Sequence, residues 1–193
     1  MTDIIGNRTL RSQWDETVRF YPDSTFLEYV STQDEVTRFP YAAFDRLVRQ
    51  AANFFLELGI QKGELVALHL HNTPEYLLCW LALAQVGAVS VPLNEHYRLA
   101  ESRYILQKCG IRRVIAETRS LWIYTENAAE LGLTDIIQAD GESPGACSLH
   151  AGCARQPAGL RETRPLSSDD MAVILFTSGT TRHPKGAVYT HAC

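Results

Sequence analysis

The feature that most constrains the fold is a regular alternation, between residues 64 and 139, of short apolar runs with longer helical segments. The runs have the length and composition of buried strands, and the segments between them carry apolar residues at helical spacing or throughout. Strand-like runs occupy 64–70, 88–93, 113–116 and 135–139, and helical segments occupy 74–84, 99–110 and 121–131. The first of these helices is apolar through Ala84, and Gly87 is expected to end it. This alternation predicts an α/β fold in which helices cover both faces of a mostly parallel sheet.

The residues before this region predict three further elements. Apolar residues near helical spacing indicate a helix at 9–21, and two short strand-like runs at 25–30 and 35–39 indicate a hairpin. A long amphipathic helix is expected to begin at Pro40 and to end at Gly59, which is a typical C-terminal stop.

Composition divides the chain into three parts. Residues 141–166 contain four glycines and three prolines and have no apolar period, which is typical of a linker or a long surface loop. A strand at 171–176 follows, then a polar loop and the start of another strand at Ala187. We therefore expect an N-terminal α/β subdomain at 1–140, a linker, and an incomplete strand–loop–strand segment at 167–193.

Charge and hydropathy argue against several classes of partner. The chain of 193 residues has a net charge of -4 and no run of like charges, which disfavours nucleic acid and anionic membrane surfaces. Its N-terminus lacks the basic start and apolar stretch of a signal peptide, and no window approaches the roughly 20 apolar residues of a membrane span. These features predict a cytoplasmic protein.

Five cysteines at irregular spacing raise the question of a metal site. Cys147, His150 and Cys153 are three possible ligands within seven residues, but no second cluster follows at the spacing of a structural zinc site. We therefore interpret them as incidental side chains of a polar loop.

The segment with the most chemical content is Phe-Thr-Ser-Gly-Thr-Thr-Arg-His-Pro-Lys-Gly at residues 176–186. Its hydroxyls and backbone N–H groups can donate to phosphate oxygens, its glycines permit positive φ and close approach of the backbone, and its lysine adds a point charge. It is not a Walker A loop, because Pro184 stands where that motif has glycine and Gly186 where it has Ser or Thr. Composition alone leaves open a solvated turn between two strands.

The order of residues within 177–186 resembles the signature loop of the superfamily of acyl-CoA synthetases, peptide-synthetase adenylation domains and luciferases. Other stretches resemble the N-terminal part of that superfamily in the same order: Arg38-Phe-Pro-Tyr41, Leu58-Gly-Ile-Gln-Lys-Gly63, Asn72-Thr-Pro-Glu75 and Gly87-Ala-Val-Ser-Val-Pro-Leu-Asn94. Finer details are similar to the crotonobetaine/carnitine–CoA ligases, among them Asp3-Ile-Ile-Gly6, Leu68-His-Leu70, Cys79-Trp80 and Ile105-Leu-Gln107. The resemblance implies the first subdomain of the large N-terminal domain of an acyl-CoA synthetase, truncated.

This resemblance implies an acid–thiol ligase that uses ATP, Mg²⁺ and CoA. In such enzymes a carboxylate attacks the α-phosphate of ATP, which gives an acyl-adenylate and pyrophosphate, and the CoA thiol then displaces AMP. The resemblance assigns the β- and γ-phosphates to Thr177, Ser178, Gly179, Thr180, Thr181, Lys185 and Gly186. It also makes His191 a candidate near the substrate, which is expected to be a small carboxylate of the betaine type.

The resemblance does not supply a complete catalytic set within 193 residues, because the family's adenine, ribose, Mg²⁺ and catalytic-lysine motifs come later in the chain. Many members have glycine at the position of Arg182, which we expect to face solvent here. We predict that the chain alone is inactive and that it self-associates through an apolar sheet edge beginning at Met171. Two alternatives stay open: a module that binds nucleotide or pyrophosphate without catalysis, and a truncated remnant that binds a partner chain.

Overall fold

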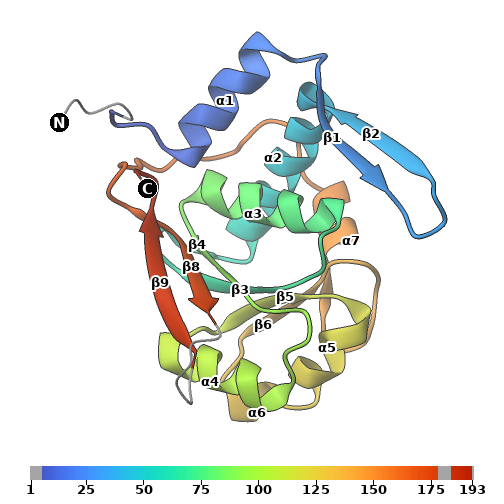
Figure 1. Cartoon of the computed structure of the whole chain (residues 1–193), viewed down its shortest axis with the longest axis vertical. Coiled ribbons are helices and arrows are strands. Elements are labelled where there is room, and N and C mark those ends of the chain that lie inside the picture. The colour runs from blue at the N-terminus through green and yellow to red at the C-terminus, as the bar shows by residue number, and fades with distance from the viewer. Residues whose placement is uncertain (1–5, 178–183, 193) are drawn as a thin grey trace.

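A seven-stranded sheet forms the centre of the protein in the computed structural model, which describes residues 6–177 and 184–192 (Figure 1). The strands are β3 (Leu65–His69), β4 (Val89–Pro92), β5 (Arg113–Ala116), β6 (Asp135–Gln138), β7 (Cys147–Ser148), β8 (Met171–Thr177) and β9 (Lys185–Thr190). Their order is β7-β6-β5-β3-β4-β8-β9, and every neighbouring pair is parallel except β8 and β9. The predicted mostly parallel sheet is confirmed.

The order of the strands creates a switch point next to β3. The chain passes from β3 to β4 on one side and then returns to β5 on the other side of β3. In open α/β sheets, ligands commonly bind beyond the carboxyl ends of the strands at such a reversal. Any polar residues that follow β3 and β5 are therefore candidates for a functional site.

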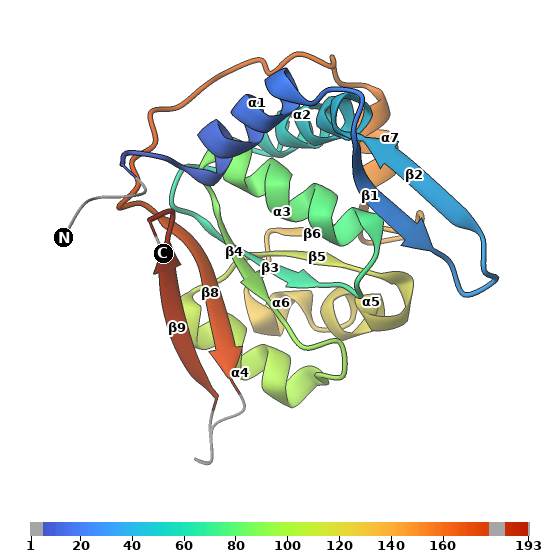
Figure 2. The same ribbon diagram turned by 45° about the horizontal axis from the view of Figure 1, so that its top comes forward.

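Helices cover both faces of the sheet (Figure 2). One layer holds α1 (Leu10–Phe20), α2 (Tyr41–Glu57), α3 (Pro74–Val86) and α7 (Leu149–Ala154), and the other holds α4 (Leu99–Cys109), α5 (Thr118–Thr125) and α6 (Ala128–Leu131). Alternate residues of β3 enter two separate cores, since Val66 and Leu68 pack with the first layer and Ala67 with the second. Within the described residues, no helix combines the length and apolarity needed to cross a membrane.

Helix α3 shows how local sequence sets the element boundaries. Thr73 is its N-cap, Pro74 lies in the first turn and Glu75 adds a negative charge at the positive end of the helix. Gly87 ends the helix with φ of 77°, and the Ala88 N–H donates to the carbonyl of Leu83. The helix therefore ends directly before Gly87, as the sequence predicted.

The predicted N-terminal hairpin is confirmed as β1 (Thr25–Val30) and β2 (Val36–Pro40), which project from the body (Figure 2). Its base is anchored by the buried Trp14 of α1. The Trp14 ring lies edge-on to Phe26 with centroids 4.8 Å apart, and its indole N–H donates to Asp45 of α2 at 2.8 Å. One aromatic side chain thus joins the hairpin, α1 and α2.

Two predictions about secondary structure were wrong. The single helix expected at 121–131 is two helices, since α5 ends at Thr125 and α6 begins at Ala128. Between them, the Asn127 side chain donates to the carbonyl of Ile123. The segment 141–166, predicted as a loop, contains β7 and α7. Helix α7 is fixed by burial of Leu149 and Cys153 against the first-layer core, a contact that the local sequence does not show.

Candidate functional site

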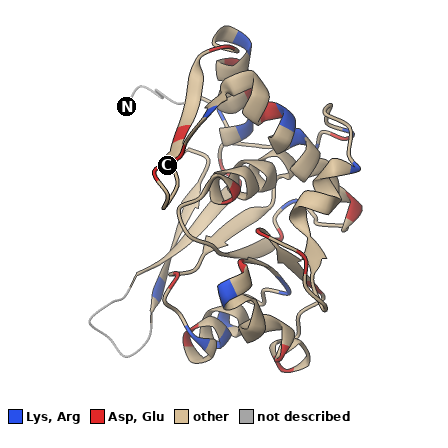
Figure 3. Ribbon diagram, turned by 90° about the vertical axis from the view of Figure 1, so that its right-hand side faces the viewer, with Lys and Arg blue, Asp and Glu red and all other residues tan. Residues whose placement is uncertain are grey.

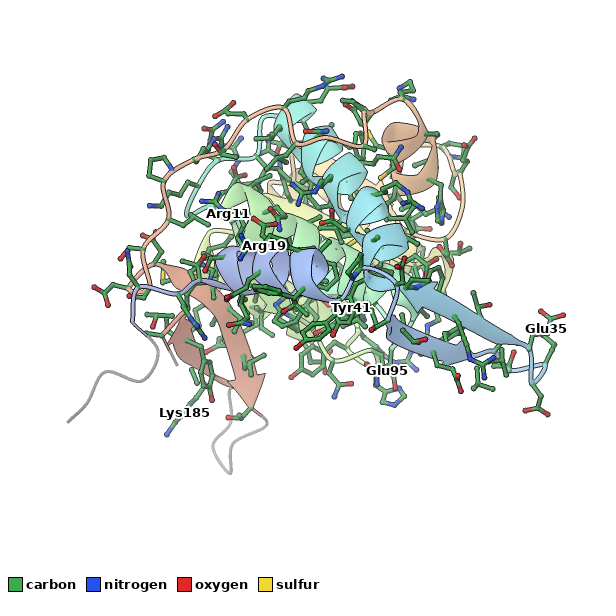
Figure 4. All side chains as sticks on the ribbon, turned by 90° about the horizontal axis from the view of Figure 1, so that it is seen from above. Arg11, Arg19, Glu35, Tyr41, Glu95 and Lys185 are labelled. Carbon is green, nitrogen blue, oxygen red and sulfur yellow. The ribbon has the colours of Figure 1, made fainter. Side chains whose placement is uncertain are left out.

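Strands β8 and β9 bring two predicted phosphate-binding residues directly opposite one another. Thr177 is the last residue of β8 and pairs with Lys185, the first residue of β9. Because β8 runs parallel to β4, both residues lie at the carboxyl edge of the sheet. Figure 4 shows the Lys185 side chain pointing outward from the start of β9. A hydroxyl and an ammonium group here can both donate to the oxygens of an anionic ligand.

Four other predicted phosphate-binding residues, Ser178, Gly179, Thr180 and Thr181, lie outside the described residues, as do Arg182 and His183. Their assignment stays a prediction. The structure describes the strands before and after this segment, β8 and β9.

Gly186 is needed for a different reason from the one predicted. It lies in β9 with a φ outside the left-handed region, so positive φ is not its role. A Cβ atom at this position would lie 3.0 Å from the Phe176 ring and 3.2 Å from Ile174. The absence of a side chain therefore lets two neighbouring residues of β8 pack across Gly186.

His191 lies at the other end of the hairpin from Lys185. Its backbone N–H donates to the Asp170 carbonyl, and its Nδ1 accepts from the backbone N–H of Leu10 at 3.2 Å. The six residue steps from Lys185 to His191 correspond to roughly 20 Å of extended strand. Burial lowers the pKa of this imidazole, which Asp170 opposes. Within the described structure His191 attaches β9 to α1 and is not brought together with Lys185.

A second polar group lies at the same edge of the sheet, around the switch point. His71 follows β3, Glu95 follows β4 and Glu117 follows β5. The His71 ring contacts Glu95 at 2.6 Å and Glu117 at 2.9 Å. Arg119 contacts both carboxylates at 3.2 Å. We call these four residues the His71 cluster.

The environment of Glu117 is unusual for a carboxyl group. Burial raises its pKa from 4.5 to about 7, and the negative charges of Asp140, Glu95 and Glu75 act in the same direction. A pocket of about 370 Å³ borders the cluster and is lined by residues that follow β3 and β4. Sequence analysis gave His71 no role. The sequence feature that could have indicated this cluster is that His71, Glu95 and Glu117 each lie just beyond the end of a neighbouring parallel strand.

The described residues do not offer a metal site. No group of three or more His, Cys, Asp or Glu side chains in this part of the chain is arranged to hold an ion. In the Cys147–Cys153 region, Cys147 is exposed, Cys153 is buried and His150 lies 3.8 Å from Glu75. Charged side chains of both signs are interspersed along the ribbon in Figure 3.

The model of the family described as AMP-binding enzyme matches residues 14–193. The chain belongs to this family. Its match continues through the hairpin that holds Thr177 and Lys185, so the candidate phosphate site lies within the family's own region.

Curated relatives support a narrower similarity. The chain is 40% identical over 194 residues to a crotonobetaine/carnitine–CoA ligase of Salmonella paratyphi A, and 38% identical over 204 residues to one of Salmonella arizonae. Each comparison covers 98% of this chain and 38% of the relative. The chain thus spans little more than a third of the length of these relatives.

Solved structures agree with the fold. The N-terminal domain of FACL13 from Mycobacterium tuberculosis has a TM-score of 0.81 and 30% identity, over 95% of this chain and 44% of that one. The anthranilate–CoA ligase AuaEII has a TM-score of 0.86 and 23% identity, over 99% of this chain and 36% of that one, which shows a shared fold. The expected first part of an acyl-CoA ligase N-terminal domain is confirmed.

Proposed function

We propose that this chain supplies the N-terminal part of an ATP-dependent acid–CoA ligase and that residues 177–186 hold the terminal phosphates of ATP. The observation that carries the proposal is the hairpin geometry, which places Thr177 opposite Lys185 at the carboxyl edge of the sheet in an AMP-binding enzyme. The hydroxyls, the two glycines and the lysine of this segment are suited to a polyanion.

In the proposed reaction, a carboxylate oxygen forms a bond to the α-phosphorus of ATP as the bond to pyrophosphate breaks. The thiol sulfur of CoA then forms a bond to the acyl carbon, and AMP leaves. Both reactants of the first step are anions, so their repulsion must be offset. Lys185 supplies a positive charge, and Thr177 and Gly186 supply a hydroxyl and a backbone N–H. The described residues include no group of His, Cys, Asp or Glu side chains that fits Mg²⁺.

We further propose a betaine-type acid as the substrate. The support is the identity of 40% to a ligase named for crotonobetaine and carnitine, spread over 98% of this chain. We also propose a cytoplasmic location and a division into 1–140, 141–166 and 167–193, in which the middle part carries β7 and α7 instead of forming a free linker. Strand β8 joins β4 through the single register pair of Ser90 with Val173, which is compatible with a boundary near residue 167.

A chimera tests the ligase proposal. The chain replaces the matching region of the Salmonella paratyphi A ligase, and ATP–pyrophosphate exchange is measured with and without crotonobetaine. We expect exchange that depends on the acid in the chimera, and none from the 193-residue chain alone. A folded chimera without exchange would reject the proposal.

Calorimetric titration of the chain itself with ATP and with pyrophosphate examines the binding-module alternative. We expect no binding of either compound at micromolar concentration, because the chain alone is proposed to hold only part of the nucleotide. Tight binding that is lost in Lys185→Ala would favour a module that binds phosphates without catalysis.

We also propose that the isolated chain self-associates through β9. This strand lies at the edge of the sheet, and the side chains of Val188 and Tyr189 are 55% and 40% exposed. Exposed apolar edges readily pair with other strands. Light scattering should show a mass that rises with concentration and a lower mass in Val188→Lys. A monomer at every concentration would contradict this proposal.

A further inference from the structure

Three loops converge on His71 at the switch point of the sheet. Its Nε2 lies 2.6 Å from Glu95 Oε2, its Nδ1 lies 2.9 Å from Glu117 Oε2, and its backbone N–H donates to Glu117 Oε1. The three residues are separated by 24 and 22 positions along the chain and follow β3, β4 and β5. The contacts therefore join three loops that are far apart in the sequence.

Two hydrogen bonds to the His71 ring would require a definite number of hydrogens in the His71 cluster. Each joins a ring nitrogen to a carboxylate oxygen at hydrogen-bonding distance, so each requires one hydrogen between the two atoms. A neutral imidazole carries one hydrogen and an ionised carboxylate carries none. Two contacts thus need one proton more than neutral His71 and two ionised glutamates provide. The extra proton lies between Nδ1 and Glu117 Oε2 when Nε2–H donates to Glu95.

The charges around the cluster favour this extra proton. With it, His71, Glu95, Glu117 and Arg119 sum to zero, and without it they sum to -1. Glu117 is only 9% exposed, so water screens that charge poorly. The ionisable groups facing the cluster from the surrounding elements are His69 of β3, Glu75 and Tyr76 of α3, His96 after β4, Arg119 of α5, Asp140 after β6 and His150 of α7. The negative charges of Asp140, Glu95 and Glu75 lie near Glu117, and they oppose the loss of its proton.

We propose that His71 and Glu117 store one proton in mildly acidic solution, and that its release as the pH rises through neutrality loosens the three loops that they join. Once the proton leaves, the Nδ1 lone pair faces an ionised carboxylate with no hydrogen between them. The loops bearing His71 and Glu95 line the pocket of about 370 Å³, at the same edge of the sheet where β8 ends. The shape of that edge then depends on pH, independently of which ligand binds there.

The sign of the pH dependence follows from the folded state holding the proton more tightly than the unfolded chain. The pKa of Glu117 is about 7 in the folded chain against 4.5 for a free side chain. The stabilisation is therefore fully present below pH 4.5 and is lost as the pH rises through about 7. The direction is the same whichever of the two partners carries the proton.

Urea unfolding of the chain between pH 5 and pH 8.5 tests the proposal, with Glu117→Gln as the informative variant. Glutamine keeps one acceptor for the His71 backbone N–H and offers an N–H to Nδ1, so it imitates the protonated carboxyl. We expect the ratio of folded to unfolded wild type to fall by about tenfold or more relative to this variant, since each pH unit allows up to tenfold. Equal pH dependence of the two proteins would overturn the proposal. Glu117 and Glu126 cap the two ends of α5. Glu126→Gln removes an exposed carboxylate and should have the same pH dependence as wild type.

Nuclear magnetic resonance of the wild type gives a second test that does not require the variant to fold. At pH 6 we expect either an imidazole of His71 with hydrogen on both nitrogens, or a Glu117 carboxyl carbon in its acid form. That signal should change between pH 6 and 8 together with the amide signals of the loops after β3 and β4. A neutral His71 beside an ionised Glu117 at pH 6 would contradict the stored proton.

Discussion

Substituting Gly152 by alanine separates the effect of packing from that of helix propensity. Alanine in place of glycine inside a helix ordinarily adds about 1 kcal/mol of stability. In α7, however, a Cβ at this position would lie 2.6 Å from two carbons of the Phe54 ring, which is only 3% exposed. Attractive carbon contacts occur at about 3.5–4.0 Å. The overlap is therefore about 1 Å, and overpacking of this kind costs about 1–3 kcal/mol.

We expect Gly152→Ala to lower the free energy of unfolding by up to about 2 kcal/mol, after the gain in propensity is subtracted. Urea unfolding followed by tryptophan fluorescence measures it. Phe54→Leu removes the ring that the new Cβ would meet. In a chain with Phe54→Leu, Gly152→Ala should therefore cost at least about 1 kcal/mol less than in wild type. Ala154→Gly, at an exposed position of α7, is the matched control for propensity alone. A Gly152→Ala chain more stable than wild type would refute the packing of α7 against α2.

Three further predictions concern the rest of the scaffold. Trp14→Phe should lower the free energy of unfolding by about 1–2 kcal/mol in urea, because it removes the indole N–H that donates to buried Asp45. Hydrogen bonding to Lys62 lowers the pKa of Asp170, so the stability that this carboxylate adds is present above about pH 4 and is lost as the pH falls through its folded pKa. In Asp170→Asn the loss of stability on acidification should be smaller, measured by unfolding from pH 6 to pH 2. Gly87→Ala should lower the thermal midpoint by several degrees, since φ of 77° strains any residue with a Cβ.

The sequence predicted those parts of the fold that short stretches of chain determine. Strand β5 was predicted at its observed bounds, because four residues rich in β-branched side chains lie between turn signals. The end of α3 was placed correctly by Gly87, the residue that caps it. The start of α5 was missed because the Thr118 N–H donates to Asp140, which lies 22 positions further along the chain. Contacts of this range are invisible to periodicity.

The candidate site divides in the same way. The segment from Thr177 to Gly186 was recognisable because its chemistry is contiguous in the sequence, and the structure adds that its two ends pair at the edge of the sheet. The His71 cluster was not recognisable, because its members come from three loops and gain their properties only when burial brings the carboxylates together. His191 illustrates the converse, since its nearness to the loop in sequence does not bring it near Lys185 in space.

The apparent KM for ATP in the chimeric ligase tests the central claim most directly, namely that the segment ending in Lys185 and Gly186 holds the terminal phosphates. Removing one charge-assisted contact costs about 1.5–3 kcal/mol, so Lys185→Ala should raise this KM by roughly ten- to a hundredfold while the KM for the acid changes less than about twofold. Lys108→Ala, an exposed lysine on α4, should leave both constants unchanged. An unaltered KM for ATP in Lys185→Ala would contradict the assignment of this segment to phosphate binding.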